Sequence, residues 1–199
     1  HSMAFDSQRG KVVLFGGAGV AQNILSDTWE WDGTNWARVI PPASPPRRMG
    51  AAMAFDSIRG KTVLCPCDDP EWSNFAKFFA LHFTDFGLRK LISTSYAPDS
   101  NPAKLDYQPT LFELESPAFD ATKTRANGKK FTLEAKDVNG DGAINIDDLQ
   151  WEYLEGDGDF RSREVTALRD EADFIITNPP FSLFRQFMTW VIGGGRKFS

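Results

Sequence analysis

The sequence predicts an α/β domain that is preceded by an all-β segment. The first third of the chain repeats a strand-like segment and is rich in tight-turn residues. The remainder alternates short buried strands with helical patterns, which is typical of α/β folds. The composition, 41% hydrophobic and 25% charged over 199 residues, is that of a folded globular protein and excludes global disorder.

The all-β segment is recognised by its internal repeat. Residues 3–14 (MAFDSQRGKVVL) recur as residues 53–64 (MAFDSIRGKTVL), with ten of twelve positions identical at a spacing of 50, which indicates a repeat architecture. MAFD and KVVLFGG flank the turn SQRG, and DTWEW and WARV flank the turn DGTN. These pairs predict two β-hairpins, because Gly in such turns supplies the positive φ that tight hairpins need.

Four short strands with a Gly-Gly pair after the second resemble one blade of a kelch-type β-propeller. The resemblance covers residues 1–64, about one and a half blades, with PPASPPRR (41–48) as the connection between blades. Blades bury their faces against neighbouring blades, yet the repeat stops after Leu64. We therefore expect a kelch-like fragment over residues 1–64, without catalytic residues, and a separate domain over residues 65–199.

The second part of the chain alternates strands with helices. One amphipathic helix, ending at Gly87, is predicted from aromatic residues at steps of three or four: Trp72, Phe75, Phe79, Phe83 and Phe86. The other expected elements are a strand over 88–96, a loop or insertion over 97–130, a helix over 163–172, a strand over 173–181 and a helix over 182–194. This alternation predicts a parallel sheet that binds ligands at the carboxyl ends of its strands.

The loop Asn178-Pro179-Pro180-Phe181 directly follows the apolar run DFIIT. Such a loop suits methylation of an exocyclic amino group, whose nitrogen is conjugated into its ring and is a poor nucleophile. The Asn178 side chain and the Pro179 carbonyl offer two acceptors for the amino hydrogens, and two consecutive prolines hold that carbonyl still. Phe181 offers a face on which an extruded base can stack.

Four strings, in this order, resemble the EcoRI-type adenine-specific DNA modification methylases: CDDPEWSNFAKFFALHF, GLRKLISTSY, LEGDGDFRS and EADFIITNPPFSLFRQF. The resemblance covers about residues 61–199 and implies a partial Rossmann-like methyltransferase sheet with helices. It implies transfer of a methyl group from S-adenosylmethionine to the N6 atom of adenine in duplex DNA. By the same resemblance, residues 178–181 match the catalytic loop of the family.

The resemblance also implies a set of cofactor-binding residues. Cys67, Asp68 and Asp69 occupy the loop after the first strand, the usual place of cofactor contacts. Asp159 and Phe160 resemble the pair that recognises the adenine of the cofactor, the carboxylate by a hydrogen bond and the ring by stacking. The chain ends at GGGRKFS, the expected start of the next strand, so we expect a truncated enzyme that is weakly active or inactive as this chain.

Residues 137–148 (DVNGDGAINIDD) fit the twelve-residue EF-hand calcium loop, with Gly at position 6 and Ile at position 8. The metal ligands of this pattern are Asp137, Asn139, Asp141, the carbonyl of Ala143, Asn145 and Asp148. The segment KKFTLEAK before the loop favours a strand, and DDLQWEYLE after it favours a helix. Calcium binding and a solvated turn inside an insertion are both compatible with this pattern.

Cysteine usage and hydropathy bear on the compartment. Cys65 and Cys67 are too close in sequence for a comfortable disulfide, and we expect reduced thiols in a cytoplasmic protein. No apolar run approaches the roughly 20 residues that span a bilayer, and no signal peptide is expected at the start of the chain. Two alternatives to a DNA methylase stay open, a non-enzymatic kelch-type interaction protein with a calcium loop and a chimeric reading frame without selected function.

Overall fold

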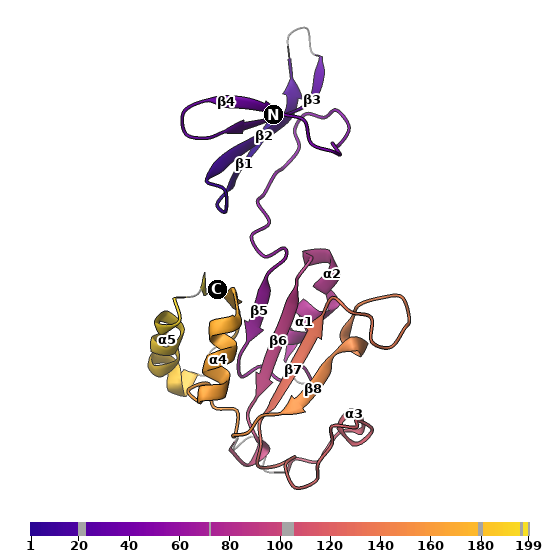
Figure 1. Ribbon diagram of the computed structural model, residues 1–199, viewed down its shortest axis with the longest axis vertical. Coiled ribbons are helices and arrows are strands. Elements are labelled where there is room, and N and C mark those ends of the chain that lie inside the picture. The colour runs from indigo at the N-terminus through magenta and orange to yellow at the C-terminus, as the bar shows by residue number, and fades with distance from the viewer. Residues whose placement is uncertain (20–22, 72, 101–105, 179–180, 196, 199) are drawn as a thin grey trace. The chain divides into compact units, whose positions relative to one another are not determined.

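The computed structural model describes residues 1–19, 23–71, 73–100, 106–178, 181–195 and 197–198 (Figure 1). The chain divides into two compact units, His1–Ser57 and Ile58–Ser199. The division lies earlier than the predicted boundary between residues 64 and 65, because the strand that ends at Cys65 belongs to the second unit.

The first unit is a four-stranded antiparallel sheet. Its strands, β1 (Ser2–Asp6), β2 (Lys11–Ala18), β3 (Ile24–Trp31) and β4 (Trp36–Val39), follow one another in sheet order. Both predicted hairpins are confirmed, and the second turns at Gly33 with a φ of 100°. The sheet has four strands, as one propeller blade does. The described residues form no closed propeller.

The two copies of the repeated segment adopt different structures. Residues 2–6 and 11–18 form the β1–β2 hairpin, whereas residues 53–56 form no strand and β5 (Thr62–Cys65) enters a parallel sheet. The predicted second half-blade is therefore wrong. All four residues of β5 are buried, whereas among the matching Val12–Phe15 only Phe15 is buried. Tertiary packing therefore decides between two pairings of nearly the same sequence.

The second unit is built on a six-stranded sheet in the order β10-β9-β5-β6-β7-β8. Its other strands are β6 (Lys90–Ser95), β7 (Lys129–Glu134), β8 (Gln150–Tyr153), β9 (Phe174–Ile175) and β10 (Lys197–Phe198). The four strands from β10 to β6 are parallel, as predicted, while β7 and β8 are antiparallel additions. The helix expected after residue 148 is thus replaced by β8, whose Trp151 and Tyr153 alternate with exposed polar residues.

Helices cover the parallel part of this sheet on both faces (Figure 1). The helices are α1 (Asn74–Leu81), α2 (Phe83–Phe86), α3 (Leu111–Leu114), α4 (Arg163–Glu171) and α5 (Phe184–Gly193), with short 3-10 turns η2 (Pro98–Ser100), η4 (Ile146–Asp148) and η5 (Phe181–Leu183). Leu64, Ile92 and Ile175 pack against α4 and α5, whereas Val63, Cys65 and Leu91 pack against α1 and α2. The alternation of side chains along each strand thus builds two separate cores.

The predicted aromatic helix is interrupted near its middle. His82 separates α1 from α2, and the second helix ends at Gly87 in the left-handed conformation, as predicted. Phe79 and Phe83 are buried against the sheet, but Phe75 is 44% exposed, and Trp72 lies outside the described residues. The aromatic stripe is therefore only partly core.

None of the helices in the described ranges has the length and apolar character needed to cross a bilayer.

The strand order places a switch point beside β5. The chain passes from β5 through α1 and α2 to β6 on one side, and later returns through α4 to β9 on the other side. In sheets of this kind, the crevice at the carboxyl ends of the two strands that flank such a reversal is the usual ligand site. The fold therefore directs attention to the loops after β5 and β9.

The repeat provides a matched pair of core substitutions. Leu64→Ala, in the fully buried β5, should lower the free energy of unfolding by about 2–5 kcal/mol because it leaves a cavity between the sheet and helices α4 and α5. Leu14→Ala, at the matching position of the half-buried β2, should cost about 1 kcal/mol. Urea denaturation followed by circular dichroism measures both, and equal losses would contradict the different burial of the two copies.

Candidate functional site

The loops that follow β5 and β9 are joined by hydrogen bonds. Ile176 N donates to Leu64 O over 3.0 Å, and the buried Thr177 hydroxyl donates to Pro66 O over 2.8 Å. Thr177 directly precedes Asn178, and Pro66 directly precedes Cys67. The structure therefore brings the start of the predicted catalytic loop next to the predicted cofactor loop.

Cys67 occupies an unusual backbone conformation at the end of β5. Its φ is 62°, and it is the single non-glycine residue with positive φ in the described part of the chain. Its amide donates to the Thr94 hydroxyl over 3.1 Å. Burial raises the pKa of the Cys67 thiol to about 12, and an interaction with the Tyr96 hydroxyl offsets part of this rise. Cys67 is thus a neutral thiol, and its strained backbone is of the kind found at functional sites.

Asp68 and Asp69 place two carboxylates at the same strand end. They are 7% and 9% exposed, and Asp68 N donates to Thr94 O over 2.6 Å. Burial raises the pKa of Asp68, and its Oδ2 has no hydrogen-bond partner within the described residues. A buried carboxylate oxygen without a partner is unfavourable. Such an oxygen is suited to accept a cationic or hydrogen-bond-donating ligand.

The Gly-Asp-Gly-Asp segment lies against the end of β6. Ala97 N donates to Asp157 O over 2.7 Å, and a Cβ on Gly158 would come within 2.2 Å of Ser95 O. The charge of Asp159 adds to the rise in the pKa of the Cys67 thiol in the predicted cofactor loop. The Arg161 guanidinium donates to the Asp159 carboxylate over 2.9 Å and lowers the pKa of that carboxyl.

Phe160 does not have the position that the resemblance implies. Its side chain is fully buried and packs edge-on against Phe187 and Trp190 of α5, with ring centroids 5.2 and 5.6 Å away. The ring belongs to the core formed with α4 and α5, and the Arg161 guanidinium lies over it, 5.6 Å from the ring centre. The ring therefore contributes to the core and has no free face on which the adenine of a cofactor could stack.

Only part of the predicted catalytic loop lies within the residues that the structure describes. Asn178 is exposed, so its amide group is accessible to a ligand. Pro179 and Pro180 lie outside the described residues. Phe181 begins the turn η5, and its side chain is likewise outside the description.

The predicted calcium loop joins β7 to β8, so it is the loop of a β-hairpin and is not flanked by two helices. The Asp148 carboxylate accepts hydrogen bonds from the amides of Val138, Asn139 and Asn145, which lower its pKa. The described residues contain no group of three or more His, Cys, Asp or Glu side chains arranged to hold a metal ion. Calcium binding by residues 137–148 stays a prediction.

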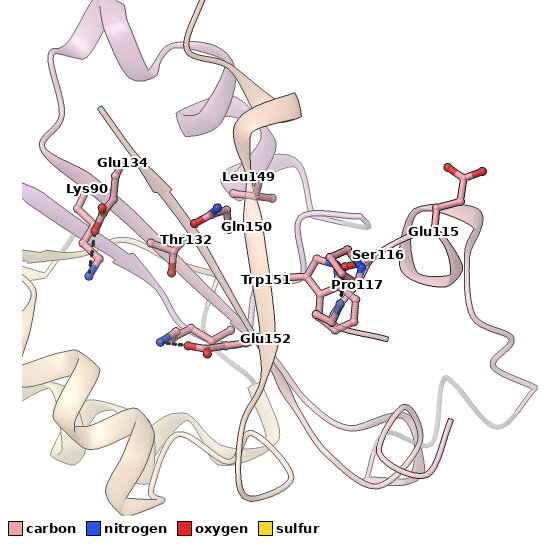
Figure 2. Close-up of a pocket in the computed structure, with 12 residues that line it drawn as sticks. Lys90, Glu115, Ser116, Pro117, Thr132, Glu134, Leu149, Gln150, Trp151 and Glu152 are labelled. Atoms are coloured by element: carbon pink, nitrogen blue, oxygen red, sulfur yellow. Dashed lines mark hydrogen bonds and ion pairs between the residues drawn. The ribbon is translucent and has the colours of Figure 1, made fainter. Parts of the chain in front are cut away.

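A hollow of ≈ 720 Å³ lies elsewhere on the second unit, along β7 and β8 (Figure 2). Its walls include Trp151 and two ion pairs, Lys90 with Glu134 at 3.5 Å and Lys130 with Glu152. The predicted catalytic, cofactor and metal residues are not among those that line it. This hollow is therefore separate from the site at the carboxyl ends of β5 and β9.

Comparison with known proteins identifies the second unit. The family model described as adenine-specific methyltransferase EcoRI matches residues 52–199. The chain belongs to this EcoRI methylase family. It is 37% identical over 138 residues to the type II methyltransferase M.EcoRI of Escherichia coli, which covers 69% of this chain and 36% of that relative.

Two Mycoplasma relatives also match this member of the EcoRI methylase family. The type II methyltransferase M.MpnI of Mycoplasma pneumoniae is 30% identical over 143 residues, covering 72% of this chain and 33% of the relative. M.MgeORF184P of Mycoplasma genitalium is 30% identical over 138 residues, covering 69% and 32%. The chain thus spans about a third of the length of the curated relatives it matches. No solved structure matches it.

Several residues at the site of this methylase family member were not predicted from its sequence. Thr94 binds the backbone of the cofactor loop, Tyr96 interacts with Cys67, and Thr177 binds Pro66. Each lies at or just beyond the carboxyl end of its strand. That position, rather than a residue motif, is the signal that could have identified them.

Gly158 provides a test of the packing at the end of β6. Gly158→Ala should lower the free energy of unfolding by at least about 2 kcal/mol, because φ is +84° and the new Cβ would meet Ser95 O. Gly156→Ala is the matched control, since nothing lies within 4 Å of its Cβ position. Thermal denaturation measures both, and a Gly158→Ala variant as stable as the control would refute this packing.

Asp68 provides a pH-dependent test. Because burial raises its folded-state pKa above the usual 3.8, its contribution to stability is present below about pH 3.8 and is lost as pH rises through the folded value. Asp68→Asn removes this loss, because the amide side chain does not ionise. The variant should therefore be more stable than the wild type at pH 7, and the difference in stability should be smaller or absent at pH 4. Urea denaturation at both pH values checks this, and a gain that does not change with pH would contradict it.

Proposed function

We propose that the second unit forms the cofactor-binding and catalytic-loop part of a DNA adenine-N6 methyltransferase that uses S-adenosylmethionine. The observation that carries the proposal is the Thr177–Pro66 hydrogen bond, which joins the loop bearing Asn178 to the loop bearing Asp68. A methyl donor and a target amino group must be held side by side, and these two loops are adjacent at the switch point of the sheet.

The residues after β5 suit this cofactor in charge and in hydrogen bonding. S-adenosylmethionine carries a positively charged sulfonium and an ammonium group, and the unpartnered Asp68 Oδ2 beside Asp69 offers negative charge in a site with little water. Asp159, whose charge acts on Cys67, is a further proposed acceptor. Its carboxylate would accept from Arg161 and from the cofactor at the same time. The bound cofactor supplies an electrophilic methyl group. The enclosed Phe160 ring is not part of this proposal.

Asn178 is proposed to orient the target amino group. Its side-chain oxygen accepts a hydrogen bond from the adenine N6 amino group, with the Pro179 carbonyl as the second proposed acceptor. Two acceptors favour a tetrahedral nitrogen whose lone pair is available for the new bond to carbon. The exposed position of Asn178 supports this role, because an extruded base can reach it from solvent.

Duplex DNA is the proposed partner, from the relatives' assignment as type II methyltransferases. Those relatives are about three times as long as the matching part of this chain. We therefore propose weak turnover for this chain, and the decisive measurement is made with enzyme in excess over DNA.

For the first unit, we propose part of a kelch-type propeller that serves as an interaction module. The four-stranded antiparallel sheet and the two hairpins support this proposal. The Trp31 and Trp36 rings, paired across β3 and β4 with centroids 5.6 Å apart, add an aromatic contact at the second hairpin.

The proposed function is tested with Asn178→Ala and, as a matched control, Asn23→Ala at an exposed position of the first unit. With S-adenosylmethionine labelled in its methyl group and excess enzyme, the wild type and Asn23→Ala should label adenine N6 in duplex DNA. Asn178→Ala should lower the rate at least about 100-fold, because one preorganised hydrogen bond to the reacting group is lost.

Binding of the cofactor, followed by isothermal titration calorimetry, is the second measurement. Asp68→Ala should weaken it at least about tenfold, since a charged partner is removed, while Asn178→Ala should leave it unchanged. A wild-type chain that binds no S-adenosylmethionine would exclude the proposal. Equal labelling by Asn178→Ala would exclude the catalytic role of Asn178.

A further inference from the structure

A buried polar network lies in the segment that joins β6 to β7. Lys129 and Glu113 form an ion pair whose side chains are only 4% and 1% exposed. Lys129 Nζ donates to the Tyr107 hydroxyl over 3.0 Å, Tyr107 donates to Glu113, and the Thr124 hydroxyl donates to Glu113 over 3.3 Å. Burial acts to raise the pKa of Glu113, but the hydrogen bonds from Lys129 and Tyr107 outweigh it and the pKa is lowered. Glu113 is therefore a paired carboxylate.

This network lies at the same edge of the sheet as the predicted cofactor loop. Lys129 is the first residue of β7 and pairs with Ser95 at the carboxyl end of β6. Its ammonium group lies 5.3 Å from the centre of the Tyr107 ring and 5.5 Å from that of Trp151. Trp151 of β8 and Pro117 of the joining segment both line the hollow along β7 and β8 (Figure 2).

A chain of hydrogen bonds leads from the ion pair to the loop after β5. Thr110 caps the N-terminus of α3 and forms a capping box with Glu113. Its hydroxyl accepts from Glu113 N over 3.3 Å and donates to Glu71 Oε1 over 2.7 Å. Glu71 N in turn donates to Asp69 Oδ1 over 3.0 Å. The hydroxyl of Thr110 is thus used as acceptor on one side and as donor on the other.

The backbone of Glu71 is bound by Asp69 and by Lys77, whose Nζ donates to Glu71 O over 3.0 Å, while its carboxylate accepts from Thr110. Burial raises its pKa and the hydrogen bond from Thr110 lowers it, while its Oε2 has no hydrogen-bond partner in the described ranges. The ion pair and the cap of α3 are complete at Glu113 without any contact to Glu71. The additional bond from Thr110 to Glu71 is the feature that connects the network to the site.

We propose that the Lys129–Glu113–Thr110 network positions the cofactor loop, residues 67–71, by fixing Glu71. Thr110 and Glu71 are positioning residues that act through Asp69 on the place where the cofactor binds. The proposal rests on the proposed function for its effect on the cofactor. Its effect on the loop itself can be measured without any cofactor.

Three variants separate the loop contact from the cap. Glu71→Ala removes the carboxylate that accepts the hydrogen bond from Thr110 and leaves the capping box intact. Thr110→Val removes the donor to Glu71 together with the cap, whereas Thr110→Ser keeps a hydroxyl for both and is the control that should behave as the wild type. All three are made in the full chain.

Hydrogen–deuterium exchange tests the positioning directly. Glu71→Ala and Thr110→Val should speed the exchange of the amides at residues 68–73 about tenfold, as expected for the loss of one hydrogen bond to a charged group, with Thr110→Ser unchanged. Exchange in this loop that is equal in all variants overturns the proposal, even if Thr110→Val is less stable through loss of the cap.

Calorimetry with S-adenosylmethionine then tests the consequence for the cofactor. Glu71→Ala and Thr110→Val should raise the Kd about tenfold, and Thr110→Ser should restore it to within about twofold. If the wild type binds S-adenosylmethionine and the variants bind it with the same Kd, the positioning role is overturned. A wild type without measurable binding overturns the proposed function, and the exchange measurement still decides whether the network holds the loop.

Discussion

The burial of β5 between two parallel neighbours is the constraint on which the second unit depends. Thr62–Cys65 are enclosed by helices on both faces, so the strand has no freedom to shift its register without exposing one of the two cores. Its carboxyl end then has a defined position, and the hydrogen bond between Thr177 and Pro66 sets the loop after β9 against it. The proposed adjacency of methyl donor and target base follows from this packing, because both loops leave the same edge of the sheet.

Much of this arrangement could be predicted from the sequence, and the failures have a physical pattern. The hairpins of the first unit, the strand ending at Ser95 and the helices beginning at Arg163 and Phe184 follow from turn chemistry and periodicity. The repeated segment misled the prediction because its local pattern suits both pairings, and only contacts distant in sequence separate them. β8 was mistaken for a helix because four residues are too few for a clear period.

The sequence predicted where the candidate site lies better than it predicted the contacts of single residues there. The acidic pair at Asp68 and Asp69 lies where the family resemblance placed it, at the end of the first parallel strand. Phe160 is adjacent to this region, but a motif cannot say whether a ring faces the ligand or the core, and α5 encloses it. Thr110 and Glu71 were missed because their contact joins segments far apart in sequence.

The near identity of residues 3–14 and 53–64 has a consequence for how the chain can be shortened. Deletion of residues 15–64, one spacing of the repeat, would fuse Lys11-Val-Val-Leu14 directly to Cys65. The resulting strand would differ from β5 by Val in place of Thr62, which is buried and accepts hydrogen bonds from Arg89. Most of the first unit could thus be deleted with a single change inside the sheet that remains, so the second unit would keep its central strand without redesign.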